Sequence, residues 1–140
     1  MICSKNSTTL YVADFGNFTL GKDCSYFTLE IAYKHQLDSM VRIHIDSDSD
    51  VDKSVENLKI IYKDFESFIE KARHHAATDY GITYDVALER LILYSLSIQD
   101  NGGYMIDFLD KSRPPGEIDT LIAIFGNVKT GHGEIPAYHF

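Results

Sequence analysis

The first third of the chain alternates between hydrophobic and polar residues, a pattern typical of half-buried β-strands. Apolar side chains occupy every second position in 26–34 (YFTLEIAYK), and 40–46 (MVRIHID) repeats the pattern. If these segments form a hairpin, Glu30 lies opposite Arg42 and the apolar faces coincide. Opposite charges and matched apolar faces favour this register over its one-residue slip. Two shorter strands are expected at 9–14 and 17–20.

An apolar stripe at helical spacing occupies the middle of the chain. Alternate steps of four and three residues separate its members: Val51, Val55, Leu58, Tyr62, Phe65, Ile69, Ala72 and Ala76. Ser49 or Asp50 can cap the helix, and Gly81 is a natural end for it. The stripe therefore predicts one long amphipathic helix. Strands on both sides in the sequence favour packing across a sheet, and a coiled-coil seam is the alternative.

The last third returns to strand patterns. A strand is expected at 92–98, followed by a hairpin turn at 101–103 (NGG) that pairs Ile98 with Ile106. Segment 120–128 is apolar on both faces, as in a central strand covered by a helix. The whole chain therefore predicts a single α+β domain, 1–140, in which one long amphipathic helix packs on one face of an antiparallel β-sheet.

The balance of charge narrows the possible partners. The chain has 140 residues and a net charge of -8, with 21 acidic and 13 basic residues. Nucleic acids and anionic membranes need a basic face, so neither is expected as a partner. No apolar run reaches the length of a signal peptide or of a membrane span, and a cytoplasmic location is therefore expected. Two cysteines, Cys3 and Cys24, favour free thiols over a Cys3–Cys24 bridge.

The most concentrated charge is the run DSDSDVD at 46–52. Its alternate carboxylates resemble the start of an EF-hand calcium loop, in which the sixth position is Gly and the twelfth is Glu. Val51 and Asn57 stand at those positions, so no calcium site is expected. A solvated turn that caps the following helix is the simplest interpretation. A weak cation site and an acidic surface for a partner are the alternatives.

Other candidate chemistry is sparse. His44 lies on the polar face of its predicted strand, where it is a candidate acid–base group without an evident nucleophile. Glu70 and His74 are four residues apart on one helical face, which gives two metal ligands but not a zinc motif. Segment 126–133 has the spacing of a phosphate-binding loop but lacks its Lys and hydroxyl residue. The sequence therefore predicts no catalytic residue, metal or cofactor.

A small, acidic α+β chain with an acid-rich strand–helix junction resembles the immunity proteins of bacterial toxin–immunity systems, including contact-dependent growth inhibition. The resemblance implies a non-catalytic protein that binds and neutralises the toxin domain of a secreted effector. A nuclease-type toxin has a basic cleft that an acidic surface complements. The partner-binding residues would be Asp46, Asp48, Asp50, Asp52, Glu56, Asp110, Glu117 and Asp119. The alternatives are a small enzyme or ligand-binding domain with a site assembled from distant residues, and a homo-oligomeric structural protein.

Overall fold

The computed structural model describes residues 8–33, 36–48, 50–112, 121–128 and 137–139. Within them, eight strands form one sheet in chain order. The strands are β1 (Thr9–Val12), β2 (Gly16–Leu20), β3 (Tyr26–Tyr33), β4 (Gln36–Asp46), β5 (Leu91–Ile98), β6 (Gly103–Asp110), β7 (Leu121–Asn127) and β8 (Ala137–His139). The helices are α1 (Val51–Lys63), α2 (Phe65–Tyr80) and α3 (Tyr84–Arg90). The expected α+β class with a mostly antiparallel sheet is confirmed.

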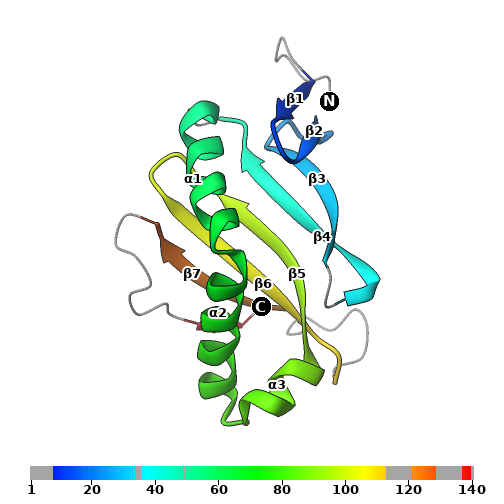
Figure 1. Ribbon diagram of the computed structural model, residues 1–140, viewed down its shortest axis with the longest axis vertical. Helices are drawn as coiled ribbons and strands as arrows, with labels where there is room; N and C mark the ends of the chain where they lie inside the picture. Colours follow the sequence, from blue (N-terminus) through cyan, green and yellow to red (C-terminus); the bar gives the residue numbers. More distant parts are fainter. Residues whose placement is uncertain (1–7, 34–35, 49, 113–120, 129–136, 140) are drawn as a thin grey trace.

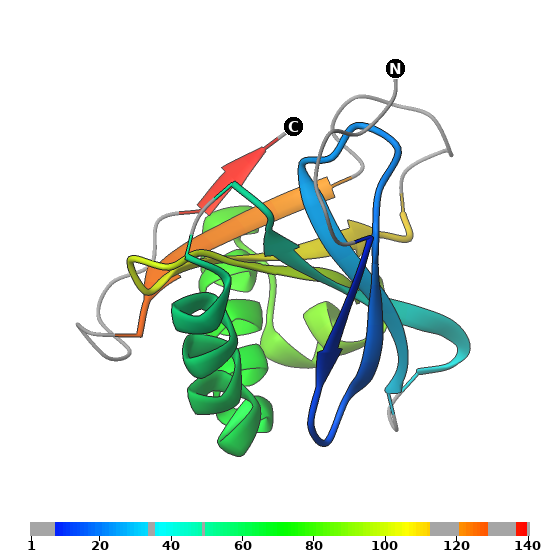
Figure 2. The ribbon, with the colours of Figure 1, turned by 90° about the horizontal axis from the view of Figure 1, so that it is seen from above.

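The three helices lie on one side of the sheet (Figures 1 and 2). They connect β4 to β5, the one parallel pair among the described strands. Parallel neighbours need such a crossover, whereas antiparallel neighbours can be joined by tight turns. Seen from above, the sheet curves so that the β1–β2 hairpin approaches the helices (Figure 2). The Phe15 ring at this hairpin lies 4.5 Å from the Tyr62 ring on α1, between ring centroids.

The predicted registers agree with the structure in one hairpin and differ in another. Glu30 pairs with Arg42 across β3 and β4, as expected. Across β5 and β6, however, Ile98 pairs with Tyr104, so the predicted pairing with Ile106 is wrong. The turn closes earlier than expected, because the Gln99 N–H already donates to the carbonyl of Gly103. A difference of two residues leaves the same side chains on each face of the strand.

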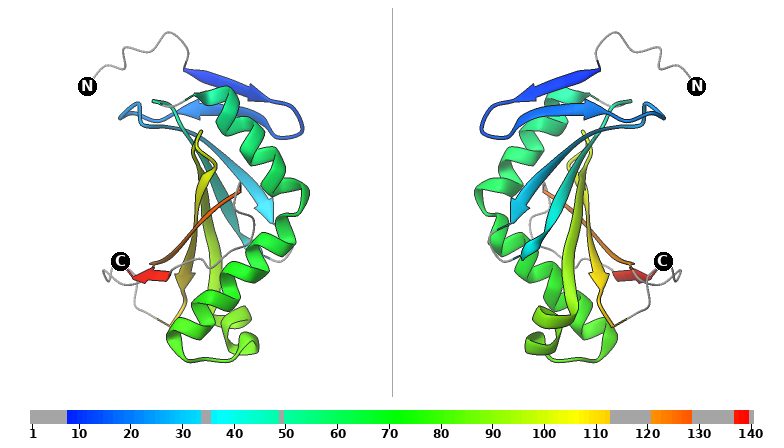
Figure 3. Two further views of the ribbon diagram at one scale, coloured as in Figure 1. Left: turned by 90° about the vertical axis from the view of Figure 1, so that its left-hand side faces the viewer. Right: turned by 90° about the vertical axis from the view of Figure 1, so that its right-hand side faces the viewer.

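The expected single long helix is wrong. Asp64 interrupts it with φ -127° and ψ 40°, so that α1 ends at Lys63 and α2 begins at Phe65. The direction of the helical segment changes at this point (Figure 3). No Gly or Pro marks the break, and the apolar stripe continues through it. Ile61 and Phe65 are buried on either side, whereas Tyr62 remains 43% exposed.

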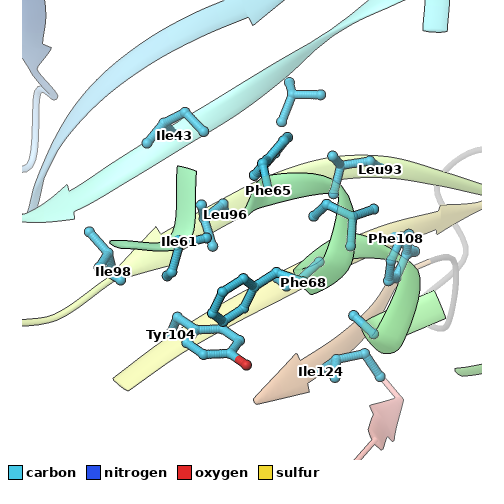
Figure 4. Packing of buried hydrophobic residues seen from close by; sticks show 14 of the residues in the cluster. Ile43, Ile61, Phe65, Phe68, Leu93, Leu96, Ile98, Tyr104, Phe108 and Ile124 are labelled. Atoms are coloured by element: carbon cyan, nitrogen blue, oxygen red, sulfur yellow. The ribbon is translucent and has the colours of Figure 1, made fainter. Parts of the chain in front are cut away.

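The core lies between the helices and the concave side of the sheet (Figure 4). The Phe68 ring meets Tyr104 edge-on, with ring centroids 5.4 Å apart. The guanidinium of Arg73 lies 5.2 Å from the centre of the Phe108 ring, although Arg73 is only 8% exposed. The α2 helix therefore contributes both apolar packing and a buried cation to the face of β6.

Cys24 is disulfide-bonded, so the expectation of a free thiol at this position is wrong. It lies in the β2–β3 connection with φ 63°, in the left-handed region. The second cysteine of the sequence, Cys3, lies outside the described residues. Among the helices of the described chain, none is long and apolar enough to cross a membrane.

Candidate functional site

The acidic run folds into a hydrogen-bonded junction between β4 and α1. The Asp48 N–H donates to Asp46 Oδ1 over 2.9 Å, which forms an Asx turn at the end of the strand. Asp50 is the N-cap of α1, and its Oδ1 accepts from the Lys53 N–H over 3.3 Å. Asp46 and Asp50 therefore shape the turn, as capping predicts. Asp48 and Asp52 are exposed.

The structure adds a carboxylate that sequence reasoning missed. The Asp50 N–H donates to Asp100 Oδ2 over 3.0 Å. The Asn57 amide on α1 donates to the carbonyls of Gln99 and Asp100, over 2.9 Å and 3.3 Å. These bonds hold the β5–β6 turn against the start of α1. No local signal could have revealed Asp100, because fifty residues separate it from Asp50.

Glu56 completes this surface on α1. It is exposed, and it lies four residues after Asp52, one turn further along the same helical face. Six carboxylates from three segments thus gather at one end of the protein. We call them the acidic junction: Asp46, Asp48, Asp50, Asp52, Glu56 and Asp100.

Asp110 does not belong to this surface or to any other exposed one. It is 1% exposed, and its two carboxylate oxygens accept from Arg90 Nε and Nη2 over 2.9 Å and 3.0 Å. Burial raises the pKa of this carboxyl, but hydrogen bonds from Arg90 and Ser112 outweigh burial and lower the pKa to about 2. The prediction that Asp110 binds a partner is therefore corrected, because its carboxylate is used inside the fold. The predicted residues Glu117 and Asp119 lie outside the described residues.

A row of polar side chains crosses the sheet face opposite the helices. Cross-strand pairing places Glu30, Arg42, Ser95 and Asp107 side by side on four consecutive strands. Arg42 Nε lies 3.5 Å from the Glu30 carboxylate, and the Arg42 guanidinium lies 4.9 Å from the centre of the Tyr94 ring. The Ser95 hydroxyl donates to Asp107 Oδ2 over 2.8 Å. Burial raises the pKa of Asp107, and the Ser95 bond lowers it by less.

His44 lies on the same face, in the next row. Its Nδ1 is 2.8 Å from Thr28 Oγ1, and the Tyr26 ring meets the imidazole edge-on at 5.8 Å. Burial, and then the charge of Arg42, lower the pKa of His44. The imidazole is therefore neutral at pH 7. Its hydrogen bond to Thr28 accounts for its position without a catalytic role.

Metal-binding groups do not converge in the described part of the chain. No three His, Cys, Asp or Glu side chains there are placed to hold one ion. The predicted pair Glu70 and His74 is 3.9 Å apart and exposed, and the His74 ring stacks on Tyr84 at 3.8 Å. This pair lies on the surface, with the imidazole against an aromatic ring.

Comparison with known proteins gives no relative: no protein-family model, curated protein or solved structure matches this chain. The acidic junction brings six carboxylates together, and such a surface can attract and orient a cationic partner.

Proposed function

We propose that the protein binds and neutralises a basic, nuclease-type toxin domain through the acidic junction. It would do so without catalysis, as an immunity protein of the contact-dependent growth inhibition type. The observation that carries this proposal is the gathering of six carboxylates from β4, α1 and the β5–β6 turn. Hydrogen bonds to the carboxylates of Asp46, Asp50 and Asp100 shape the turn before any partner arrives, so that less order must be gained on binding.

Charge supports the same conclusion. The chain carries -8, and Lys53 is the basic residue nearest in sequence to the run of aspartates. A nuclease must present cations where it holds phosphates. Opposite potentials on two such surfaces accelerate their encounter, from about 10⁵–10⁶ to as much as about 10⁸–10⁹ M⁻¹s⁻¹ at low salt. A neutralising protein that must act quickly benefits from this acceleration.

The test is a kinetic measurement with a matched control. Asp48→Asn with Asp52→Asn removes two exposed charges from the acidic junction and leaves the Asp50 cap intact. Asp85→Asn with Glu89→Gln removes two exposed charges from α3, at the other end of the helical segment (Figure 1). The partner is the purified toxin domain encoded beside the gene for this protein. We expect the first pair to slow association several-fold at low salt and the second pair to leave it nearly unchanged.

The proposal would be contradicted by no binding of the neighbouring toxin domain, by equal slowing with both pairs of substitutions, or by a salt-independent association rate. Exposed charges are screened beyond about 8 Å at physiological ionic strength. The effect of Asp48→Asn with Asp52→Asn must therefore shrink as salt is added. A change confined to the dissociation rate would also count against electrostatic steering.

A cytoplasmic location is part of the same proposal, and it requires that the protein work without the disulfide at Cys24. Cytosolic reductants keep most protein thiols reduced. The disulfide at Cys24 must therefore be dispensable for folding and binding if the protein works there. Its position in the β2–β3 connection, away from the helix–sheet core, supports this condition.

A ligand-binding site on the sheet face opposite the helices is the second candidate. A hollow of about 310 Å³ lies on this face, near the lower end of the range for small-ligand sites. Its lining includes the Arg42 guanidinium, which stacks on the Tyr94 ring, and the apolar side chains of Met40 and Leu109. A screen of small carboxylates by nuclear magnetic resonance tests this candidate. Binding that disappears in Arg42→Gln would favour it over the immunity proposal.

A further inference from the structure

The outer edge of β3 is only partly covered by its neighbour in the sheet. Strand β2 pairs with β3 at two positions, Thr19 with Thr28 and Leu20 with Phe27. Strand β3 continues to Tyr33, while the β1–β2 hairpin turns away from it (Figure 3). Beyond Thr28, the described residues place no strand on this side of β3.

The direction of the main-chain groups on β3 follows from two hydrogen bonds at its start. The Tyr26 carbonyl accepts from the Gly21 N–H on the β2 side, over 3.0 Å, whereas the Ser25 carbonyl accepts from the Ser47 N–H at the end of β4. Main-chain groups alternate in direction along a strand. Glu30 therefore directs both its N–H and its C=O group toward the uncovered edge. Ala32 directs its N–H there as well, just before the β3–β4 register shifts between Ala32 and Tyr33.

A hollow of about 490 Å³ adjoins this edge. It lies between the end of β3 and the break that separates α1 from α2. Its lining comes from 31–33 on the strand and from 62–66 on the helices and the break between them. We call this hollow and the adjoining edge the β3 groove.

Aromatic rings line the β3 groove. Phe65 meets the Tyr33 ring edge-on at 5.7 Å and lies 5.5 Å from Tyr62. Tyr62 continues the series to Phe15 on the β1–β2 hairpin. The Tyr33 hydroxyl donates to Glu66 Oε2 over 3.2 Å, which ties the end of β3 to α2. One wall is thus a strand edge with available main-chain groups. The other is aromatic and is exposed through Tyr62, because Tyr33 and Phe65 are buried.

We propose that the β3 groove binds an extended segment of a partner protein, which adds to the sheet as a strand beside β3 and places a bulky apolar side chain among the rings. Alternate N–H and C=O groups at the strand repeat are complementary to an extended backbone, and such strand addition is a general mode of peptide recognition. A second copy of this chain would bring its own α1–α2 break against the same hollow, so a single extended segment fits better. The inference does not depend on the acidic junction or on the nature of a toxin.

Proline at position 32 makes a selective test. The Ala32 N–H points to the groove and not to β4, so Ala32→Pro removes a donor from the open edge without removing a β3–β4 hydrogen bond. Ala32→Val is the matched control, because valine keeps the N–H and suits a strand. The probes are linear peptides selected from a phage-displayed library against the whole protein. We expect the selected peptides to bind Ala32→Pro about tenfold more weakly than Ala32→Val, the loss of one main-chain hydrogen bond.

Hydrogen exchange supplies a second measurement that does not depend on the folding of the proline variant. In the native protein, bound peptide should slow exchange of the Glu30 and Ala32 amides at least tenfold. N-methylation of the peptide backbone should abolish both the binding and the slowing. Tyr62→Ala should weaken binding through the apolar side of the groove.

Each contrary result overturns the inference. These results are a library that yields no binder, binders that leave the Glu30 and Ala32 amides unprotected, or equal affinity for the two Ala32 variants. If the Glu30 and Ala32 amides become protected from exchange when the protein concentration is raised without peptide, the edge binds a second copy of the chain instead. Asp48→Asn with Asp52→Asn should leave peptide binding unchanged, so failure of this inference and failure of the proposed function are separate observations.

Discussion

The ion pair between Arg90 and Asp110 makes a quantitative prediction about stability. Arg90 is the last residue of α3, and Asp110 is the last residue of β6. Two hydrogen bonds of 2.9 Å and 3.0 Å join the guanidinium to the carboxylate, and the guanidinium also lies 4.9 Å from the centre of the Tyr80 ring. Arg90→Met keeps a stem of similar length over Tyr80 and removes the charge.

The magnitude follows from the burial of the carboxylate. Removing one partner of a buried ion pair costs about 3–5 kcal/mol, because the other charge is left in the interior. Ser112 still donates to Asp110 through its N–H and hydroxyl in the variant, over 2.9 Å and 2.7 Å. We therefore expect Arg90→Met to lose about 3 kcal/mol of stability at pH 7, the lower end of this range. The lowered pKa of Asp110, about 2, agrees in direction, because the folded protein favours the ionised carboxylate that the ion pair needs.

The same shift predicts a pH dependence. The pKa of Asp110 is lower in the folded state, so its contribution is complete well above pH 4 and is lost as the pH falls through 4 toward 2. The free energies of unfolding of the native protein and of Arg90→Met, measured by urea denaturation, should therefore differ by about 3 kcal/mol at pH 7. Near pH 2 the difference should be much smaller. The control is Arg42→Met, because Arg42 and Glu30 form an exposed pair at 3.5 Å that should contribute less than about 1 kcal/mol.

Two results would refute this reasoning. A loss below about 1 kcal/mol in Arg90→Met would mean that the Asp110 carboxylate is well solvated. A difference between the two proteins that does not change with pH would mean that the pair does not hold the carboxylate in its ionised form. Loss of toxin binding in Asp110→Asn at unchanged stability would restore the sequence-based assignment of Asp110 to the partner surface.

Three further predictions concern other parts of the molecule. Gly126→Ala should cost about 1–3 kcal/mol in urea denaturation, because a methyl group there would overlap the buried ring of Tyr104 on the neighbouring strand. Burial raises the pKa of Asp107, so the contribution of this carboxyl to stability is complete below pH 3.8 and is lost as the pH rises through its folded-state pKa. Asp107→Asn should remove this contribution to the pH dependence without lowering stability at pH 7. Reduction of the Cys24 disulfide should leave the near-ultraviolet circular dichroism of the core unchanged.

The sequence predicted those parts of the fold in which the pattern and the pairing are local. The β3–β4 register was correct from Tyr26 to Ala32, because Glu30 and Arg42 favour one alignment, but it shifts at Tyr33, which pairs with Gln36. The helix break at Asp64 was missed, since the apolar stripe continues across it and no Gly or Pro interrupts the pattern. The parallel pairing of β4 with β5 was not anticipated, because it depends on where the helices return the chain.

Among the candidate sites, too, the sequence predicted the local features and missed those that depend on residues far apart in the chain. Capping rules reduced the N-cap to Ser49 or Asp50, and the structure selects Asp50, whose bond reaches only three residues along the chain. Asp110 was misassigned because its partner, Arg90, lies twenty residues earlier, and a charge count cannot tell a buried carboxylate from an exposed one. The β3 groove combines a strand edge with a helix break that lies some thirty residues away. Its existence depends on the point at which β2 leaves β3, which no local pattern encodes.

The acidic junction and the β3 groove lie at the two ends of α1, and this arrangement makes a last prediction. The helix has 13 residues, so about 20 Å separates its ends. A standard interface of about 800 Å² per partner is wide enough to include both. Sites this far apart without shared contacts contribute additively to the binding free energy.

If one partner uses both surfaces, Asp48→Asn with Asp52→Asn should mainly slow association and Ala32→Pro should mainly speed dissociation. The combined variant should then show the product of the two effects. Should either change leave the affinity for the toxin domain unaltered, the two surfaces serve different partners.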